Sequence, residues 1–496
     1  MTVKRFKPRC ESGARGSVCR NALRHLARCG CALPAWGLLS MAAASPVHAH
    51  SAERGLVLLL PTELYVIGGA ASVLASFLLL AVVSAERFRR VADWRIRLFA
   101  CRPLRGTISS LVSFAALCVL LYWGFAGSRD PLANPLPLFV WTGWWVMFSL
   151  VQCVLGDLWR LFNPWQGPVR VLRALLRLPE SFARLPDRVG YLPAIVLFVM
   201  FAWFELIYIA PEDPARLGYF VSAFWLINFL AALVFGERDW FERGEPFSIF
   251  FRLIGSLSPF TRGRSSGDAG AIHLSVPGRT LSILPPLPLS GVVFVLTTLG
   301  TVSYDGLSRT FFWLQRIGVN PLEFPGRSAV WVQNTLGMTL ALGCLILLFG
   351  ACVHLGCRLA GTGSSRQAAG RLVYSIIPIS LVFHFAHYLT QILVNGQYLL
   401  LALDDPMASG RSLLGLGHFH VTTSFLNHIE PVAVIWGFQT AVIVAGHAVG
   451  IAIAHSIALD QCRSLRQATR SQLYLAGLMV AYTVFGLWLL STAAIG

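Results

Sequence analysis

Apolar runs of about twenty residues recur along nearly the whole chain, separated by polar segments. An α-helix needs about 20 mostly apolar residues to cross the hydrocarbon core of a bilayer, so each run predicts a membrane-spanning helix. The predicted fold is therefore all-α, a polytopic integral membrane helix bundle. Ten helices are predicted, over residues 62–84, 107–127, 137–156, 190–210, 217–236, 284–303, 330–357, 371–393, 430–455 and 471–495.

The first 49 residues have the pattern of a secretory signal peptide. Eight lysines and arginines lie within the first 28 positions, an apolar stretch follows over residues 31–44, and Val47-His48-Ala49 is similar to a cleavage site of the A-x-A type. Cleavage after Ala49 would make His50 the mature N-terminus and leave one transmembrane domain over residues 50–496. The basic region is longer than usual, so retention of the segment as a membrane anchor stays open.

The distribution of charge supports a membrane protein rather than a nucleic-acid-binding one. The chain is 55% hydrophobic with a formal net charge of +17. Its arginines alternate between loops: 25 lie in the segments after the odd-numbered predicted helices and only seven in the opposite set. Positive residues accumulate on the cytoplasmic side of membrane proteins. This ratio predicts both termini in the periplasm, a multi-pass location in the bacterial inner (cytoplasmic) membrane, the lipid bilayer as partner and no nucleic acid.

Two predicted cytoplasmic connections are rich in tryptophan and arginine. Residues 156–165 and 235–247 combine indole rings with charged positions, which suits the headgroup layer and predicts interfacial anchoring. The stretch over residues 261–280 contains Gly, Ser and Arg and is predicted to be a mobile loop.

Five of the twelve histidines fall at the predicted outward side of the last helices. His384 and His387 are three residues apart on one helix, which places their Cβ atoms about 5–6 Å apart on one face. Ionisable groups at membrane depth are expensive and therefore indicate function. Two readings stay open for this pair: ligands of one metal ion, or histidines that only hydrogen-bond across helices.

Further candidate groups lie at the same predicted depth. The loop before the ninth helix contains His418, His420 and His428, and Glu430-Pro431 begins that helix, where a carboxylate also suits the helix dipole. Asp305 in Tyr304-Asp305-Gly306 is the best carboxylate candidate, with a turn-forming role as the alternative, and Glu205 lies near the outer end of the fourth helix. A free amine on His50 beside its own imidazole would bind copper.

Several short motifs, taken in order, resemble the fenitrothion hydrolase family of membrane-bound organophosphorus hydrolases. They are His48-Ala49-His50, Leu60-Pro61, Gly156-Asp157-Leu158-Trp159 with Asn163-Pro164-Trp165, Tyr304-Asp305-Gly306 and the helix from His384 to Tyr388. The resemblance implies hydrolysis of a phosphotriester or thiophosphotriester at the membrane, and it leaves open a second membrane subunit or a homo-oligomer. It transfers no catalytic residues.

These residues lead to a hypothesis of metal-dependent hydrolysis of an apolar small molecule at the periplasmic side. A divalent ion (zinc, manganese, cobalt, iron or copper) would activate water and polarise the phosphoryl oxygen. The expected ligands come from His384, His387, His418, His420, His428 and His50, with Glu430, Asp305 and Tyr388 as catalytic groups. The alternative is a protein that handles or transports a metal such as copper through the same histidines, which predicts polar residues continuing across the bilayer, including Gln439 and His447.

Overall fold

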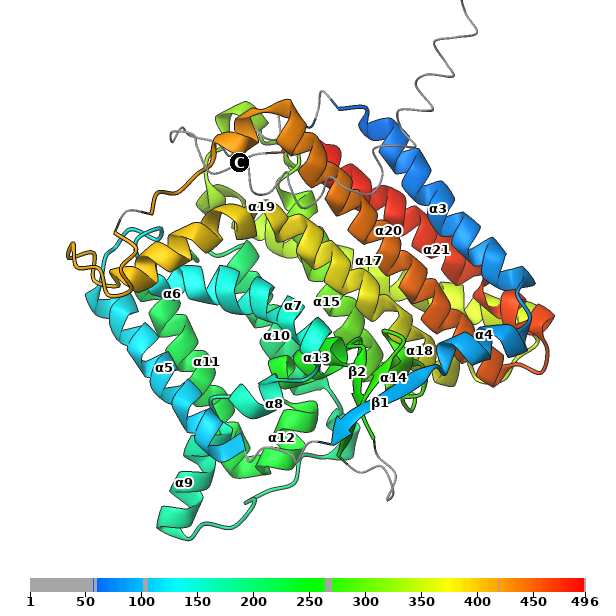
Figure 1. The fold of residues 1–496 in the computed structure, drawn as a ribbon, viewed down its shortest axis with the longest axis horizontal. Helices are drawn as coiled ribbons and strands as arrows, with labels where there is room; N and C mark the ends of the chain where they lie inside the picture. Colours follow the sequence, from blue (N-terminus) through cyan, green and yellow to red (C-terminus); the bar gives the residue numbers. More distant parts are fainter. Residues whose placement is uncertain (1–56, 58–59, 101–105, 264–269, 418, 495–496) are drawn as a thin grey trace, which may run out of the picture.

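The computed structural model describes residues 57, 60–100, 106–263, 270–417 and 419–494 (Figure 1). The molecule is an all-α polytopic helix bundle, as predicted, with one small sheet. The predicted signal peptide, His50 and His418 lie outside the described residues.

Eight helical stretches are long and apolar enough to cross a membrane. They are α3 (Thr62–Val82), α5 (Gly106–Ala126), the continuous α6–η1–α7 (Pro135–Leu155), α11 (Pro214–Phe235), α17 (Arg327–Ala360), the continuous α18–η4–α19 (Ser365–Asp404), α20 (Ile429–Gln461) and α21 (Leu465–Ser491).

The other two predicted spans are helices as well, but each differs from a full apolar span. The fourth, α10 (Leu192–Leu206), has 15 residues, fewer than the bilayer core requires. The sixth, α15 (Leu289–Ser308), has 20 residues but carries threonines, serines and Asp305 along its buried length. Both helices contribute carboxylates to the candidate site described below.

Short elements connect the long helices. They are α4 (Ala85–Ala92), α8 (Trp159–Phe162), α9 (Gln166–Leu176), η2 (Asp187–Val189), α12 (Glu237–Arg243), α13 (Pro246–Gly255), α14 (Arg279–Ser282), α16 (Phe311–Arg316), η3 (Pro321–Glu323) and η5 (Ser424–Asn427). Within the continuous stretches, α6 is Pro135–Leu138, η1 is Phe139–Phe148, α7 is Ser149–Leu155, α18 is Ser365–Leu372, η4 is Val373–Ser375 and α19 is Ile376–Asp404.

The long helices form two groups with α19 between them (Figure 1). Helices α3, α15, α17, α20 and α21 pack against one another, and α5, α6, η1 and α11 make up the second group. Helix α19 contacts α15 and α20 on one side and η1 and α6 on the other. Side chains on opposite faces of α19 therefore reach different halves of the molecule.

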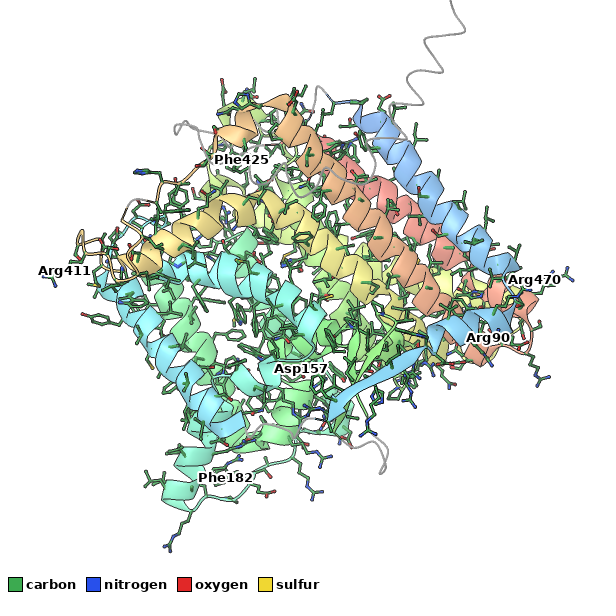
Figure 2. The ribbon with its side chains drawn as sticks, viewed as in Figure 1. Arg90, Asp157, Phe182, Arg411, Phe425 and Arg470 are labelled. Atoms are coloured by element: carbon green, nitrogen blue, oxygen red, sulfur yellow. The ribbon has the colours of Figure 1, made fainter. Side chains whose placement is uncertain are left out.

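The ends of the helices agree with the alternation of arginines along the sequence. Arg90 and Arg470, both predicted to be cytoplasmic, lie at one end of the α3, α20 and α21 bundle, whereas Arg411 and Phe425 of the predicted outward loop lie toward the other side (Figure 2). Chain segments assigned to one side by charge thus share one side of the fold.

The tryptophans of these connections do not face outward, as an anchor in the headgroup layer would require. Trp159, Trp165 and Trp240 are buried inside the protein. The Trp165 indole N–H donates to the carbonyl oxygen of Trp225 at 2.9 Å, and that of Trp240 donates to Oδ1 of Asn228 at 3.0 Å. The segments fold back as α8, α12 and α13 between the longer helices, and the Trp165 and Trp240 indoles find partners within the protein.

The predicted loop over residues 261–280 is partly a sheet. Strands β2 (Phe260–Arg262) and β3 (Ala271–Ser275) pair antiparallel, and β3 also pairs with β1 (Arg95–Ala100) in the order β1-β3-β2. The hydropathy pattern gave no sign of the pairing between β1 and β3, because these two strands lie far apart in the sequence.

Helix η1 is a π-helix of ten residues with the sequence FVWTGWWVMF. π-Helical turns are rare and often occur at functional sites. On η1, Trp141 and Trp144 line a cavity, whereas Trp145 faces His384 of α19. The π-helix thus lies between an aromatic cavity and the polar residues of α19.

Candidate functional site

The buried end of α15 holds a carboxylate with three polar partners. Asp305 is 1% exposed, and its Oδ1 accepts from Nε and the Nη2 group of Arg309 at 3.1 and 3.0 Å. The two residues are four positions apart, which places them on one helical face. Nε2 of His387 lies 2.6 Å from Oδ2 of Asp305, a short contact between α19 and α15.

Tyr388 connects this pair to a second carboxylate. Its hydroxyl lies 3.0 Å from Oδ2 of Asp305 and 3.0 Å from Oε1 of Glu205 on α10. A hydroxyl has one proton to donate, so it cannot satisfy both carboxylates at once. If the Tyr388 hydroxyl donates to one carboxylate, the other carboxyl group must be protonated and donate to the hydroxyl oxygen. We call Glu205, Asp305, Arg309, His387 and Tyr388 the outer polar cluster.

The orientation of His387 leaves one ring nitrogen for chemistry. Because Nε2 faces the Asp305 carboxylate, Nε2 carries the proton in the neutral ring and Nδ1 is the acceptor. About 9% of the His387 side chain remains exposed. No described residue forms a hydrogen bond with Nδ1, so this nitrogen can accept a proton from a small molecule.

His384 faces a different neighbour, the π-helix η1. It is buried, and its Nε2 lies 3.2 Å from the carbonyl oxygen of Trp145. Its ring meets the Trp145 ring edge-on at 4.8 Å between centroids. This hydrogen bond links α19 to η1, so His384 fits the alternative in which a histidine only hydrogen-bonds across helices. The Trp145 indole nitrogen also approaches the Glu205 carboxylate but does not complete a hydrogen bond.

The histidines of the predicted outward loop do not join His384 or His387. His420, His428 and Glu430 are exposed, and Glu430 lies in the first turn of α20, where a carboxylate stabilises the helix dipole. Among the described residues there is no group of three or more His, Cys, Asp or Glu side chains arranged to hold a metal ion. Of the predicted metal ligands that the structure describes, His384, His387, His420 and His428, no three come together.

Of the predicted site residues, Asp305, His387 and Tyr388 do come together. Sequence reasoning considered Glu205 but gave it no partner, and it missed Arg309 and Trp145. The spacing of Arg309 four residues after Asp305 was a usable signal, because oppositely charged residues at that spacing pair on helices.

A second set of buried polar residues runs along α20 toward the predicted cytoplasmic side. Nδ1 of His447 lies 2.9 Å from the carbonyl oxygen of Ile443, so Nδ1 carries the proton and Nε2 is an unpaired acceptor. Nδ1 of His455 accepts from the Gln472 side chain at 3.3 Å, so its Nε2 carries the proton and lacks a partner. Gln439 donates to the carbonyl oxygen of Ala386 at 2.8 Å.

The geometry of the outer polar cluster can move protons and hold a developing negative charge. An imidazole oriented by a carboxylate is the usual arrangement of a general base, and Tyr388 and Arg309 are hydrogen-bond donors beside it. No family model, no curated protein and no solved structure matches the chain. The resemblance in the sequence therefore stays a prediction.

Proposed function

We propose that the protein is a membrane-bound hydrolase of neutral phosphotriesters or thiophosphotriesters, with the outer polar cluster as its catalytic centre. The observation that supports this proposal is the buried Asp305–His387 contact of 2.6 Å with Tyr388 beside it. The sequence motifs listed above support the same substrate class.

In this mechanism His387 acts as general base. Its Nδ1 takes a proton from water as the water oxygen forms a bond to phosphorus. The bond from phosphorus to the leaving oxygen breaks, and the leaving group receives that proton from the imidazolium. Asp305 stabilises the imidazolium and fixes the tautomer. In this proposal the single Tyr388 proton turns from its carboxylate partner to the phosphoryl oxygen as negative charge develops there.

Metal participation has less support than the sequence indicated. His387 and Asp305 already pair with each other, and the exposed His420 and His428 supply no further ligand near them. Among the described residues no three such ligands group together, so the proposed mechanism is written without a metal step. Hydrolysis is expected to persist after exhaustive chelation, and activity that disappears with EDTA and returns with one added metal would restore the metal-dependent reading.

The test uses the purified full chain in lipid vesicles and 4-nitrophenyl diethyl phosphate, a neutral triester that releases a coloured phenolate. His387→Gln is expected to lower kcat by about 10²–10⁴-fold, the usual contribution of a general base. The control is His384→Gln, which removes a buried histidine of α19 that faces η1 instead. The proposal fails if wild-type protein releases no phenolate, or if folded His387→Gln and His384→Gln hydrolyse the triester equally well.

A second function, proton or cation transfer across the membrane, is favoured by one specific observation. His447 and His455 are buried in α20, and their Nε2 atoms have no partner among the described residues; Gln472 contacts His455, and Gln439 lies further along the same helix. Unpaired polar atoms at membrane depth are costly. Proteoliposomes with a pH-sensitive dye inside would show dissipation of a pH gradient that His447→Leu abolishes. No difference from protein-free vesicles would remove this candidate.

A further inference from the structure

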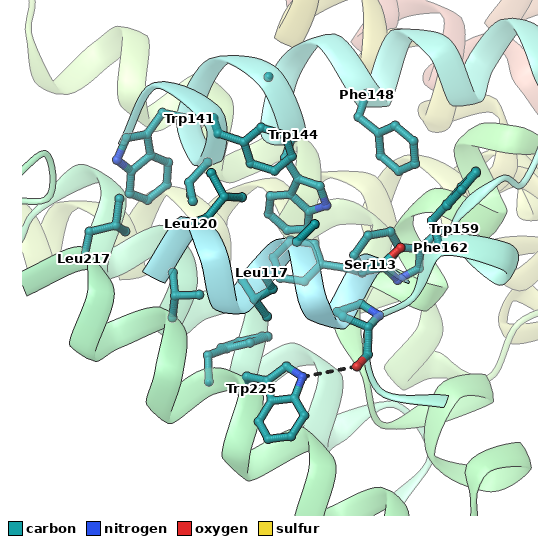
Figure 3. A pocket seen from close by; sticks show the side chains of 18 of the residues that line it. Ser113, Leu117, Leu120, Trp141, Trp144, Phe148, Trp159, Phe162, Leu217 and Trp225 are labelled. Atoms are coloured by element: carbon teal, nitrogen blue, oxygen red, sulfur yellow. Dashed lines mark hydrogen bonds between the residues drawn. The ribbon is translucent and has the colours of Figure 1, made fainter. Parts of the chain in front are cut away.

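A cavity of about 440 Å³ lies among η1, α5 and α11, separate from the outer polar cluster (Figure 3). Small-molecule sites in proteins usually measure about 300–1,000 Å³. Residues of α8, α10 and α13 complete its wall. The cavity is thus large enough to hold a compact organic ligand.

The lining is dominated by aromatic rings. Five tryptophans and seven phenylalanines are among its 21 residues, more than half of the wall. The tryptophans are Trp141, Trp144, Trp159, Trp165 and Trp225. Lipid-facing or core positions can be filled by Leu, Ile and Val alone, so this excess of rings sets the cavity apart from ordinary helix packing.

Most polar groups in the lining have partners within the protein, whereas the Trp159 indole nitrogen has no hydrogen-bond partner among the described residues. None of the described lining residues is charged. The Ser113 hydroxyl donates to the carbonyl oxygen of Ser109 at 3.0 Å. The indole N–H groups of Trp141 and Trp225 donate to the carbonyl oxygens of Pro211 at 3.1 Å and Pro164 at 3.3 Å, the latter drawn as a dashed line in Figure 3. A charged ligand would find no counter-ion here, so the ligand must be neutral.

The angles between the rings favour an aromatic ligand over a lipid acyl chain. Trp144 meets Phe247 at 4.5 Å and 70° and Phe201 at 6.2 Å and 85°, both edge-to-face. A further planar ring can continue this arrangement, which adds about 0.5–1.5 kcal/mol per aromatic pair beyond the buried area. A saturated chain gains only the burial.

We propose that this cavity is a binding site for a neutral aromatic molecule that partitions into the membrane. The binding does not depend on hydrolysis. An aromatic layer separates the site from the outer polar cluster: Phe201 contacts Trp145 at 5.0 Å, Trp145 contacts His384 at 4.8 Å, and His384 contacts Tyr388 at 5.0 Å between ring centroids. A bound ligand would thus be separated from α19, the helix that positions His387, by the Trp145 ring.

The test uses benzophenone, which is neutral, aromatic, photoreactive and not a phosphotriester. The full chain in lipid nanodiscs is irradiated with benzophenone, and the labelled peptides are mapped by mass spectrometry. Label is expected in the segments that line the cavity, around residues 113–120, 139–148 and 217–225. Excess unlabelled naphthalene should suppress it.

Matched variants on α5 decide whether the label reports the cavity. Ala116 lines the cavity, whereas Val119 on the same helix is exposed and does not. Ala116→Trp should fill the space and lower labelling of the lining peptides about tenfold or more, equivalent to at least about 1.4 kcal/mol. Val119→Trp should label like wild type. Val221→Trp fills the cavity from α11 and serves if Ala116→Trp does not fold.

Two outcomes overturn the proposal. One is equal benzophenone labelling of the lining peptides in Ala116→Trp, Val221→Trp and Val119→Trp. The other is labelling of the same peptides by a phospholipid with a photoreactive acyl chain, lost on cavity filling and undiminished by naphthalene, which would assign the space to lipid. Neither outcome concerns His387, so a failure here is distinct from a failure of the proposed hydrolase.

Discussion

Replacing Asp305 by asparagine is the sharpest perturbation of the outer polar cluster, because the side chain keeps its size while it loses its charge and exchanges one acceptor oxygen for an NH2 donor. The carboxylate is buried and accepts from Arg309, His387 and Tyr388. Removing one partner of a buried ion pair costs about 3–5 kcal/mol. The Arg309 side chain is 37% exposed and keeps part of its hydration, so we expect Asp305→Asn to lower the unfolding free energy by about 2–3 kcal/mol.

The assay is a denaturation midpoint measured on purified variants in one detergent. A double-mutant cycle with Arg309→Gln isolates the pair: Asp305→Asn/Arg309→Gln should be less destabilised than the sum of the single variants, with an interaction energy of about 1–3 kcal/mol. Glu323→Gln removes an exposed carboxylate and is the control. If Asp305→Asn unfolds at the same midpoint as Glu323→Gln, Asp305 does not hold the cluster together.

Two further predictions concern helix packing and pH. A Cβ on Gly356 of α17 would overlap the backbone carbonyl oxygen of Ser471 on α21, so Gly356→Ala should lower the unfolding free energy by about 1–3 kcal/mol in the same denaturation assay. Gly350→Ala meets open space on the same helix and should leave stability unchanged or raise it by up to about 1 kcal/mol. Equal midpoints for the two variants would contradict the close packing of α17 against α21. Backbone N–H groups of Ser409 and Gly410 donate to Asp405 and lower its pKa. The stabilisation from these bonds is therefore present above the ordinary carboxyl pKa of about 4 and is lost as pH falls through the lowered value. Amide exchange at residues 409–410, corrected for intrinsic rate, should accelerate on acidification in wild type and show no such pH dependence in Asp405→Asn.

The long helices could be predicted because their signal is local. A run of about twenty apolar residues is sufficient evidence of a span, and all ten predicted segments are helical. The π-helix and the three-stranded sheet could not be predicted in the same way. The sheet depends on pairing between residues 95–100 and 271–275, and FVWTGWWVMF has the hydropathy of any apolar helix.

The candidate site was predicted in part for a geometric reason. His384 and His387 are three residues apart, which leaves them about 60° apart around the helix axis. Helix α19 has η1 on one side and α15 on the other, so this angle is enough for one ring to face Trp145 and the other Asp305. Spacing along one helix gives the separation of two side chains, but only the neighbouring helices decide whether they share a ligand.

The aromatic cavity shows the same limit. Trp144, Trp159 and Trp225 come from three separate segments and meet only in the folded chain. In the sequence Trp159 was interpreted as part of a membrane-interface segment, since indole is common there, whereas Trp144 and Trp225 fell inside predicted spans. The burial of Trp159 reverses that interpretation.

The sheet β1-β3-β2 constrains how the molecule can change shape. Strand β1 lies between α4 and α5, and β3 lies between α13 and α14, so one hydrogen-bonded ladder fastens together chain segments that lead into both helical groups. A rocking motion that separated the two groups at this end would have to break backbone pairing. Any opening of the bundle should therefore hinge about the strands and widen at the opposite, predicted periplasmic mouth.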